Sequence, residues 1–124
     1  MEYIKIKNAD KIVKSCPYVV NDPKNYKGKW QTLFKNKNPI YLELGMGRGD
    51  FIIDMSKSYP NINFIGLEAI DSQMVRAVEN LTNKNLSNLK LINCNAEEVD
   101  NVFQKEIDTI YLTFCDPWPK KIDE

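Results

Sequence analysis

The feature that most constrains this chain is the stretch 39–49, in which an apolar run leads directly into three glycines. Residues 40–44 have strand composition, and the glycines follow at every second position: Gly45, Gly47 and Gly49. Apolar side chains then recur at helical spacing up to Tyr59, which predicts an amphipathic helix. A strand, a glycine turn and a helix in this order predict an α/β fold. Glycines suit such a turn because they allow a tight bend and a close approach of a ligand.

The glycine turn differs from the two common phosphate-binding loops. It lacks the Gly-Lys-Ser/Thr ending of a P-loop, and its spacing is not Gly-x-Gly-x-x-Gly. Glu43, one residue before the end of the strand, would repel a phosphate but attract a cation or accept a hydrogen bond from an amine. The turn therefore favours a cationic ligand. The alternative is an ordinary glycine-rich turn of an α/β domain without a ligand.

Composition limits the remaining possibilities. A chain of 124 residues forms one domain, and it contains no apolar stretch of membrane-spanning length and no signal-peptide pattern, so we expect a cytoplasmic protein without a membrane partner. Three cysteines lie far apart and histidine is absent. We therefore expect no metal site, and catalysis by a histidine base is excluded.

Charge divides the chain into two parts. Residues 1–38 carry nine lysines against three acids, whereas residues 39–124 carry eight Lys and Arg against fourteen acids. We expect 1–38 to form a basic N-terminal arm with a short helix near 27–35, and 39–124 to form the α/β part. The arm is a candidate contact for a polyanion. A lysine-rich solvated surface is the alternative.

Three further strands are predicted at 63–68, 89–94 and 108–114, with helices at 71–81, capped by Asp71, and at 97–103. Glu68 ends the second strand, where an acid in nucleotide-binding folds accepts hydrogen bonds from both ribose hydroxyls. The alternative is a helix-capping or exposed acid. Asn95 and Ala96 end the third strand, and an Asn amide can read the edge of an adenine.

The fourth strand leads into a loop that contains Asp116, Trp118, Lys120 and Lys121. Prolines on both sides hold the Trp118 ring in position for stacking on a base, and the two lysines provide charge for a phosphate. Because ligands bind at the carboxyl ends of parallel strands, we expect this loop, the glycine turn, Glu68 and Asn95 to meet in one crevice. A rigid surface turn with an incidental tryptophan is the alternative.

These residues carry a resemblance to a known family. The pattern Glu43-x-Gly45-x-Gly47-x-Gly49, the segments 66–68 and 114–121, and Tyr26-Lys-Gly-Lys-Trp30 resemble the bacterial tRNA (guanine-N7)-methyltransferases, from about Asn21 to Lys121. The Asp-Pro-Trp-Pro-Lys-Lys loop is the specific part, since many methyltransferases share the glycine pattern. The resemblance implies a Rossmann-like methyltransferase fold, a mostly parallel sheet with flanking helices. The chain stops at Glu124, so we expect an incomplete sheet of about four strands.

The resemblance also implies S-adenosylmethionine as the cofactor and a guanine in the variable loop of tRNA as the methyl acceptor. Together with the reading of the strand ends, it predicts cofactor binding by Glu43, Gly45, Gly47, Glu68, Asn95, Ala96 and Asp116. Asp116 matches the catalytic position, where it would stabilise the charge that develops on the purine. Contacts with the tRNA are expected from Lys120, Lys121 and Trp118.

Three alternatives remain open at this stage. The chain could be a truncated fragment that binds cofactor or RNA without activity, and an open sheet edge would then favour self-association. It could be a non-catalytic RNA-binding module. It could also methylate an exocyclic amino group, because Asp-Pro followed by an aromatic residue is similar to the Asp-Pro-Pro-Tyr loop of those enzymes.

Overall fold

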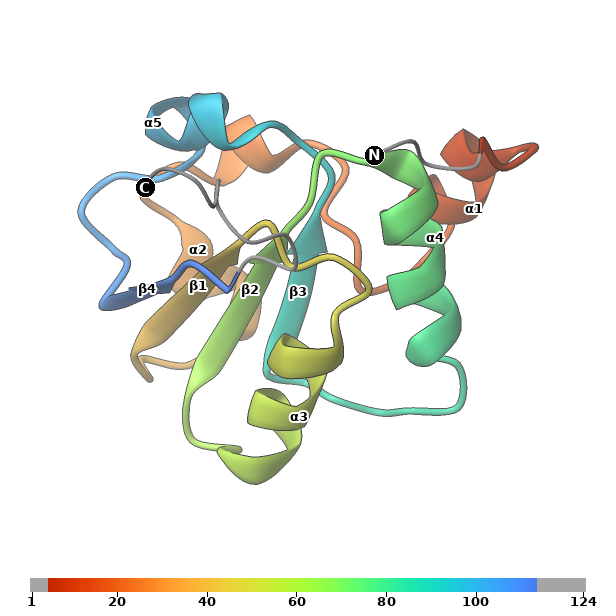
Figure 1. The fold of residues 1–124 in the computed structure, drawn as a ribbon. Coiled ribbons are helices and arrows are strands. Elements are labelled where there is room, and N and C mark those ends of the chain that lie inside the picture. Colours follow the sequence, from red (N-terminus) through yellow and green to blue (C-terminus); the bar gives the residue numbers. More distant parts are fainter. Residues whose placement is uncertain (1–4, 114–124) are drawn as a thin grey trace, which may run out of the picture.

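A parallel sheet with the strand order β3-β2-β1-β4 forms the centre of the computed structural model, which describes residues 5–113 (Figure 1). The strands are β1 (Ile40–Leu44), β2 (Asn63–Leu67), β3 (Leu89–Ile92) and β4 (Thr109–Tyr111). All three pairs of neighbouring strands are parallel. The loops that follow β1, β2 and β3 therefore leave the sheet at the same end (Figure 1). The predicted four-stranded parallel sheet is confirmed.

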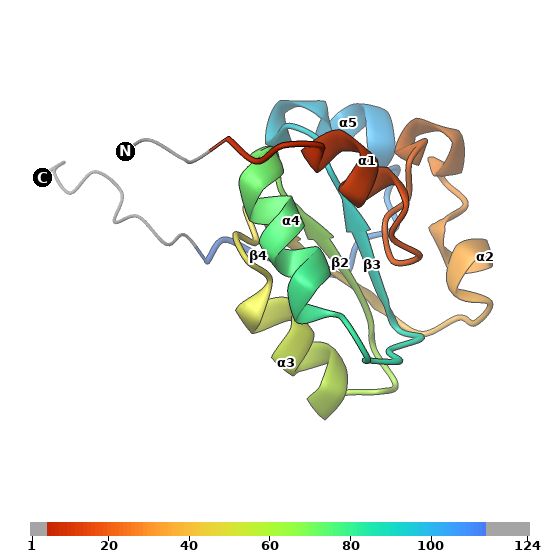
Figure 2. The ribbon, with the colours of Figure 1, turned by 90° about the vertical axis from the view of Figure 1, so that its right-hand side faces the viewer.

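The sheet is covered on both faces, as Figure 2 shows from the side. On one face lie α1 (Ala9–Lys14), α3 (Asp50–Ser58) and α4 (Asp71–Asn80), and on the other lie α2 (Trp30–Phe34) and α5 (Val99–Val102). The 3-10 turns are η1 (Pro23–Tyr26) and η2 (Ala96–Glu98). Every residue of β2 is buried, which explains its nearly continuous apolar sequence.

Two segments of the N-terminal part contact the sheet directly. Leu91 donates its backbone N–H to Tyr18 and accepts the N–H of Val20, both at 2.9 Å, so residues 18–20 cover the outer edge of β3. Trp30 is completely buried in α2, and its indole N–H donates to the carbonyl of Val102 at 2.9 Å. The basic segment is thus anchored at residues 18–20 and again at Trp30.

The predicted helix at 27–35 is shorter in the structure, because α2 begins only at Trp30. Gly28 adopts a φ of 79°, outside the helical region. The carboxylate of Glu106 accepts the backbone N–H groups of Gly28 at 2.7 Å and of Trp30 at 3.1 Å. These long-range bonds replace the helical turn that the sequence pattern predicts.

The predicted cap of α4 is wrong. Asp71 is the first helical residue, and Ile70 occupies the capping position with an extended backbone. The backbone N–H of Ile70 donates to the Glu68 carboxylate at 3.0 Å, so the chain stays extended through residue 70. Asp71 still places a negative charge in the first turn, where it is favourable for the helix dipole.

The outer edge of β4 differs from that of β3. Within residues 5–113, no strand pairs with this side of β4. Ile110 and Leu112 are 51% and 59% exposed beside it. No helix in the same residues is long and apolar enough to cross a membrane.

Candidate functional site

The glycine loop between β1 and α3 is built from residues with left-handed backbone conformations. The φ angles are 73° at Gly45, 60° at Gly47 and 83° at Gly49. Residues that carry a Cβ atom rarely adopt positive φ angles of this size. The backbone N–H groups of Gly45 and Met46 donate to the carbonyl of Leu67 at 2.9 and 3.0 Å. The loop therefore folds back across the end of β2 instead of continuing the strand direction.

Glu68 lies directly after β2 and binds this loop. Its Oε1 accepts the N–H of Gly47 at 2.7 Å, and its Oε2 accepts the N–H of Ile70 at 3.0 Å. The side chain is only 6% exposed. The predicted alternative of an exposed acid is therefore wrong. Each carboxylate oxygen carries a second lone pair, so hydroxyl groups of a ligand can bind in addition to the two amides.

Glu43 is buried next to the loop, with 1% of its surface exposed. Burial, and to a smaller extent the negative charge of Glu68, raise the pKa of its carboxyl group to about 8. Its Oε1 atom is buried and has no hydrogen-bond partner within residues 5–113. A buried carboxyl oxygen without a partner is unfavourable, and a cationic or N–H-donating ligand would remove this penalty.

The end of β3 contributes amide groups. Asn95 Oδ1 accepts the N–H of Glu97 at 3.1 Å and so caps η2, which begins at Ala96. Asn93 donates its side-chain amide to the carbonyl of Glu68 at 3.0 Å. Asn95 and Ala96 are exposed and follow β3, which is parallel to β2 and β1, so they lie at the same end of the sheet as the glycine loop.

The structure thus brings Glu43, Gly45, Gly47 and Glu68 together, and it puts Asn95 and Ala96 after the neighbouring strand. The other predicted site residues lie outside the described residues: Asp116, Trp118, Lys120 and Lys121.

Sequence reasoning missed two residues that support the site. A Cβ atom on Gly66 would collide with Met46 Sδ of the glycine loop and lie 3.2 Å from Leu91 Cδ2. Glycine inside an apolar strand is a recognisable signal for such a close approach. Asn93 gives no comparable signal, because only the folded sheet brings its amide to the Glu68 carbonyl.

Within residues 5–113, no group of three or more His, Cys, Asp or Glu side chains is arranged to hold a metal ion. Cys16 and Cys94 are free thiols. The polar groups that converge on the glycine loop are therefore carboxylates, amides and backbone N–H groups.

Comparison with known protein families identifies this arrangement. Residues 37–123 match the model of a family described as "Putative methyltransferase", which covers the sheet, the glycine loop and both glutamates. The chain belongs to this methyltransferase family.

Relatives of this methyltransferase chain are named tRNA (guanine-N(7)-)-methyltransferase. The protein from Geobacillus sp. (strain WCH70) is 47% identical over 116 residues, which are 93% of this chain and 53% of the relative. The protein from Oceanobacillus iheyensis is 50% identical, and the match covers 86% of this chain and 50% of the relative. The protein from Bacillus subtilis (strain 168) is 42% identical, and the match covers 93% of this chain and 54% of the relative. The chain spans about half the length of the curated relatives it matches.

Solved methyltransferases share the fold. An antibiotic-related methyltransferase aligns with a TM-score of 0.63 and 19% identity over 77% of this chain and 49% of that one. A 30S ribosomal A1408 methyltransferase from an uncultured bacterium aligns with a TM-score of 0.57 and 21% identity, and the alignment covers 77% of this chain and 45% of that one. The predicted Rossmann-like methyltransferase fold is confirmed.

Proposed function

We propose that this chain binds S-adenosylmethionine at the carboxyl ends of β1, β2 and β3, as part of a cytoplasmic methyltransferase that acts on N7 of a guanine in tRNA. The observation that carries the proposal is the buried Oε1 of Glu43, which has no partner within residues 5–113 and lies beside a glycine loop with positive φ angles. A sulfonium and an ammonium group give this cofactor the positive charge that such a carboxylate favours.

The residues present fit the cofactor. Glu43 provides a carboxyl group near the glycine loop that the positive charge of the cofactor would ionise, and the loop residues Gly45 and Gly47 leave space for close approach. Glu68 has lone pairs left for the ribose hydroxyls, and Asn95 with Ala96 provides polar groups for the adenine edge. We also assign Asp116 to this site, and Trp118, Lys120 and Lys121 to the tRNA.

The choice of tRNA as the substrate is supported by the relatives, which carry the name of this activity at 42–50% identity. The basic segment 1–38 adds a surface that favours a polyanion. The chemistry of the acceptor agrees with the absence of histidine. Guanine N7 has an in-plane lone pair, so no proton must be removed before it attacks.

The cofactor supplies an activated methyl group when it is bound. Methylation of N7 by this group would leave a positive charge on the purine. The protein must align the two partners and stabilise this charge. We assign the second task to Asp116, which acts by its charge and hydrogen bonding and removes no proton before the attack.

Two measurements test the proposal. Calorimetry with S-adenosylhomocysteine checks cofactor binding, and transfer of a labelled methyl group to bulk tRNA, followed by digestion and mass spectrometry, identifies the methylated atom. We expect binding and the formation of 7-methylguanosine. Asp116→Asn should lose most methyl transfer while retaining cofactor binding.

Other results would contradict the proposal in different ways. Methylation of an exocyclic amino group would leave the cofactor assignment intact and overturn the acceptor atom. Binding of tRNA without any binding of S-adenosylhomocysteine would favour an RNA-binding module. Cofactor binding without transfer, in this chain and in a version extended at its C-terminus, would overturn the assignment of the activity.

A further inference from the structure

The two halves of the basic segment 1–38 lie on opposite faces of the sheet (Figure 2). Residues 5–20 include α1, which packs with α4 in one apolar cluster. Residues 21–38 include α2, which packs in the other cluster together with α5. The sequence contains one continuous basic segment, but the fold gives its two halves different neighbours.

The half at 21–38 is neutralised by the segment that follows β3. Residues 21–38 carry five lysines and one acid, whereas residues 95–108 carry five acids and one lysine. The two segments are in direct contact. Lys24 forms an ion pair of 3.3 Å with Glu98, and the Glu106 carboxylate accepts backbone N–H groups of the basic half. The positive excess of one segment is therefore balanced by the negative excess of the other.

The half at 5–20 has no such acidic neighbour. It carries four lysines and one acid, and the segment on which it packs, 69–90, carries three Lys and Arg against two acids. Besides the contact of α1 with α4, the Tyr18 hydroxyl joins the two segments by donating to the carbonyl of Lys84 at 2.8 Å. Positive charge therefore accumulates on this side of the molecule. We call the exposed surface of residues 5–20 and 69–90 the α1–α4 face.

The lysines of the α1–α4 face are available to a partner. Lys7 and Lys11 are exposed and form no ion pair in the described part of the chain. Lys14 pairs with Asp10 at 3.3 Å, but the two side chains are 65% and 77% exposed. Ion pairs as exposed as this one contribute little to stability, so a stronger anion can replace the aspartate at small cost.

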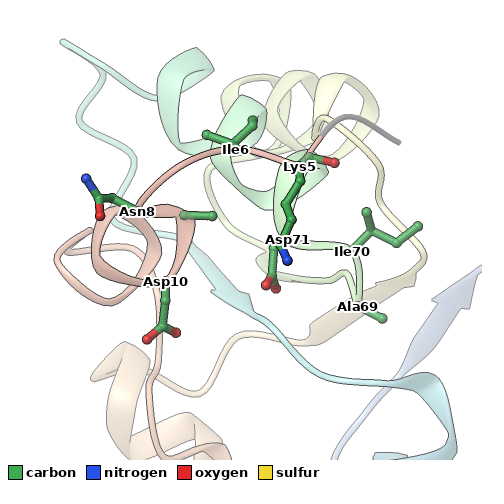
Figure 3. A pocket seen from close by; sticks show the side chains of 9 residues that line it. Lys5, Ile6, Asn8, Asp10, Ala69, Ile70 and Asp71 are labelled. Atoms are coloured by element: carbon green, nitrogen blue, oxygen red, sulfur yellow. The ribbon is translucent and has the colours of Figure 1, made fainter. Parts of the chain in front are cut away.

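The α1–α4 face adjoins the proposed cofactor site. A pocket of about 570 Å³ lies between residues 5–10 and 69–72, and Figure 3 shows Lys5 extending toward Asp71 beside it. Ile70 lines the same pocket and donates its backbone N–H to Glu68, which also binds the glycine loop. A long ligand that lies across α1 therefore passes close to the end of the sheet at which we place the cofactor.

The chemistry of the α1–α4 face fits a phosphate backbone better than a protein or a membrane. Ile12, at 37%, is the only large apolar side chain of α1 and α4 that is exposed. Protein interfaces are built around buried aromatic and apolar anchors, and helices that lie on membranes need a broad apolar face. Binding to nucleic acid is instead driven by Lys and Arg side chains that release counterions from the phosphates.

We propose that the α1–α4 face binds the phosphate backbone of the tRNA. This inference rests on the proposed function, which names tRNA as the substrate. It narrows the surface that favours a polyanion from the whole of segment 1–38 to its first half. It also assigns an RNA contact to α1, which lies outside the matched region 37–123.

Two triple variants with the same change in charge test the assignment. The first combines Lys7→Gln, Lys11→Gln and Lys14→Gln, and the second combines Lys27→Gln, Lys29→Gln and Lys37→Gln, all at exposed positions. Fluorescence anisotropy measures the binding of labelled bulk tRNA at several KCl concentrations. We expect the first variant to bind roughly 10-fold more weakly and to reduce the salt dependence, the slope of log K against log salt, by about 2, since each lost phosphate contact removes roughly 0.7–0.9. The second variant should retain most of the wild-type slope.

A third variant distinguishes charge from other properties of the side chains. Lys7→Arg, Lys11→Arg and Lys14→Arg together keep the charge, so we expect the affinity and the slope of the wild type. Calorimetry with S-adenosylhomocysteine and urea unfolding should give wild-type values for all three variants, because the substituted side chains are exposed and lie outside the cofactor site.

The outcomes separate this inference from the proposed function. If the wild type binds tRNA and the two Gln variants lose equal affinity, or the first loses none, the inference is wrong and the proposed function stands. A loss in the Arg variant as large as in the first Gln variant would also overturn it. If the first Gln variant loses binding of polyglutamate but not of tRNA, the face takes an acidic polypeptide instead. If the wild type binds no tRNA, the proposed substrate fails, and the inference fails with it.

Discussion

The Oε1 atom of Glu68 accepts a hydrogen bond of 2.7 Å from the backbone N–H of Gly47, which joins the end of β2 to the glycine loop after β1. The same carboxylate accepts the N–H of Ile70 through its other oxygen. Glu68 thus has a structural task in addition to the ligand contact that we propose for it.

The structural task of Glu68 can be tested with Glu68→Gln. The substitution replaces one acceptor oxygen by an NH₂ group, which leaves a backbone N–H without a partner and lowers the free energy of unfolding by about 1–3 kcal/mol. Because the same change alters the glycine loop, we expect weaker binding of S-adenosylhomocysteine. Urea unfolding and calorimetry measure the two effects.

Glu106→Gln is a matched control for this change. Glu106 also binds backbone N–H groups through both oxygens, at Gly28, Trp30 and Gln104, but it lies away from the glycine loop. We expect lower stability with unchanged cofactor affinity. Equal losses of affinity in the two variants would mean that Glu68 acts only through general stability.

Glu43 should make stability depend on pH. Its pKa rises from 4.5 to about 8 in the folded protein, first because of burial and second because of the Glu68 charge. Between these values the folded protein holds a proton that the unfolded chain has released, so the free energy of unfolding falls as the pH increases from about 4.5 to 8. Glu43→Gln removes this contribution. Urea unfolding at several pH values should show a smaller decrease for the variant, and parallel curves would contradict the assignment.

Binding of a cationic ligand should also depend on this group. A positive charge near Glu43 favours its ionised form, so binding of S-adenosylmethionine below pH 8 should release a proton and strengthen as the pH rises toward about 8. Calorimetry in two buffers with different ionisation enthalpies measures this proton. The apparent enthalpy should differ between the buffers for wild type and not for Glu43→Gln.

Gly66→Ala should disturb the glycine loop from inside the sheet. The added Cβ collides with Met46 Sδ, and Met46 is 4% exposed, so its side chain must shift within the core. Overpacking of this kind costs about 1–3 kcal/mol of unfolding free energy. Combining Gly66→Ala with Met46→Ala removes the collision, so chemical denaturation should show that the double variant is more stable than the sum of the two single effects predicts. Additive effects would contradict the contact.

The outer edge of β4 should support self-association. Ile110 and Leu112 are largely exposed beside an edge that pairs with no strand in the described part of the chain, and such edges favour pairing between molecules. We expect light scattering to show concentration-dependent oligomers, and Ile110→Lys with Leu112→Lys to reduce them. Tyr59→Lys, at a 49% exposed position after α3, is the control and should have no effect. A monomer at all concentrations would contradict this expectation.

Several elements follow from local sequence alone. The run Ile40–Leu44 forms β1 with the predicted bounds, and the predicted strand at 63–68 differs from β2 by one residue. The period of apolar residues identifies the strands and helices because each element must bury one or two of its faces. Where a side-chain hydrogen bond to the backbone competes, this reasoning fails. Glu106 holds Gly28 and Trp30 in a turn, and Glu68 binds Ile70 where the cap of α4 was expected at Asp71.

The amino-acid sequence by itself determined the parallel α/β core and the position of the glycine loop, because periodicity and glycine spacing act over a few neighbouring residues. Only the tertiary structure decided that Glu68 fixes the loop, that Glu43 is buried with a raised pKa, and that the N-terminal residues 5–10 line one pocket with residues 69–72. These relationships join residues from 21 to more than 60 positions apart, and burial and hydrogen bonding at such distances exist only once the chain has folded.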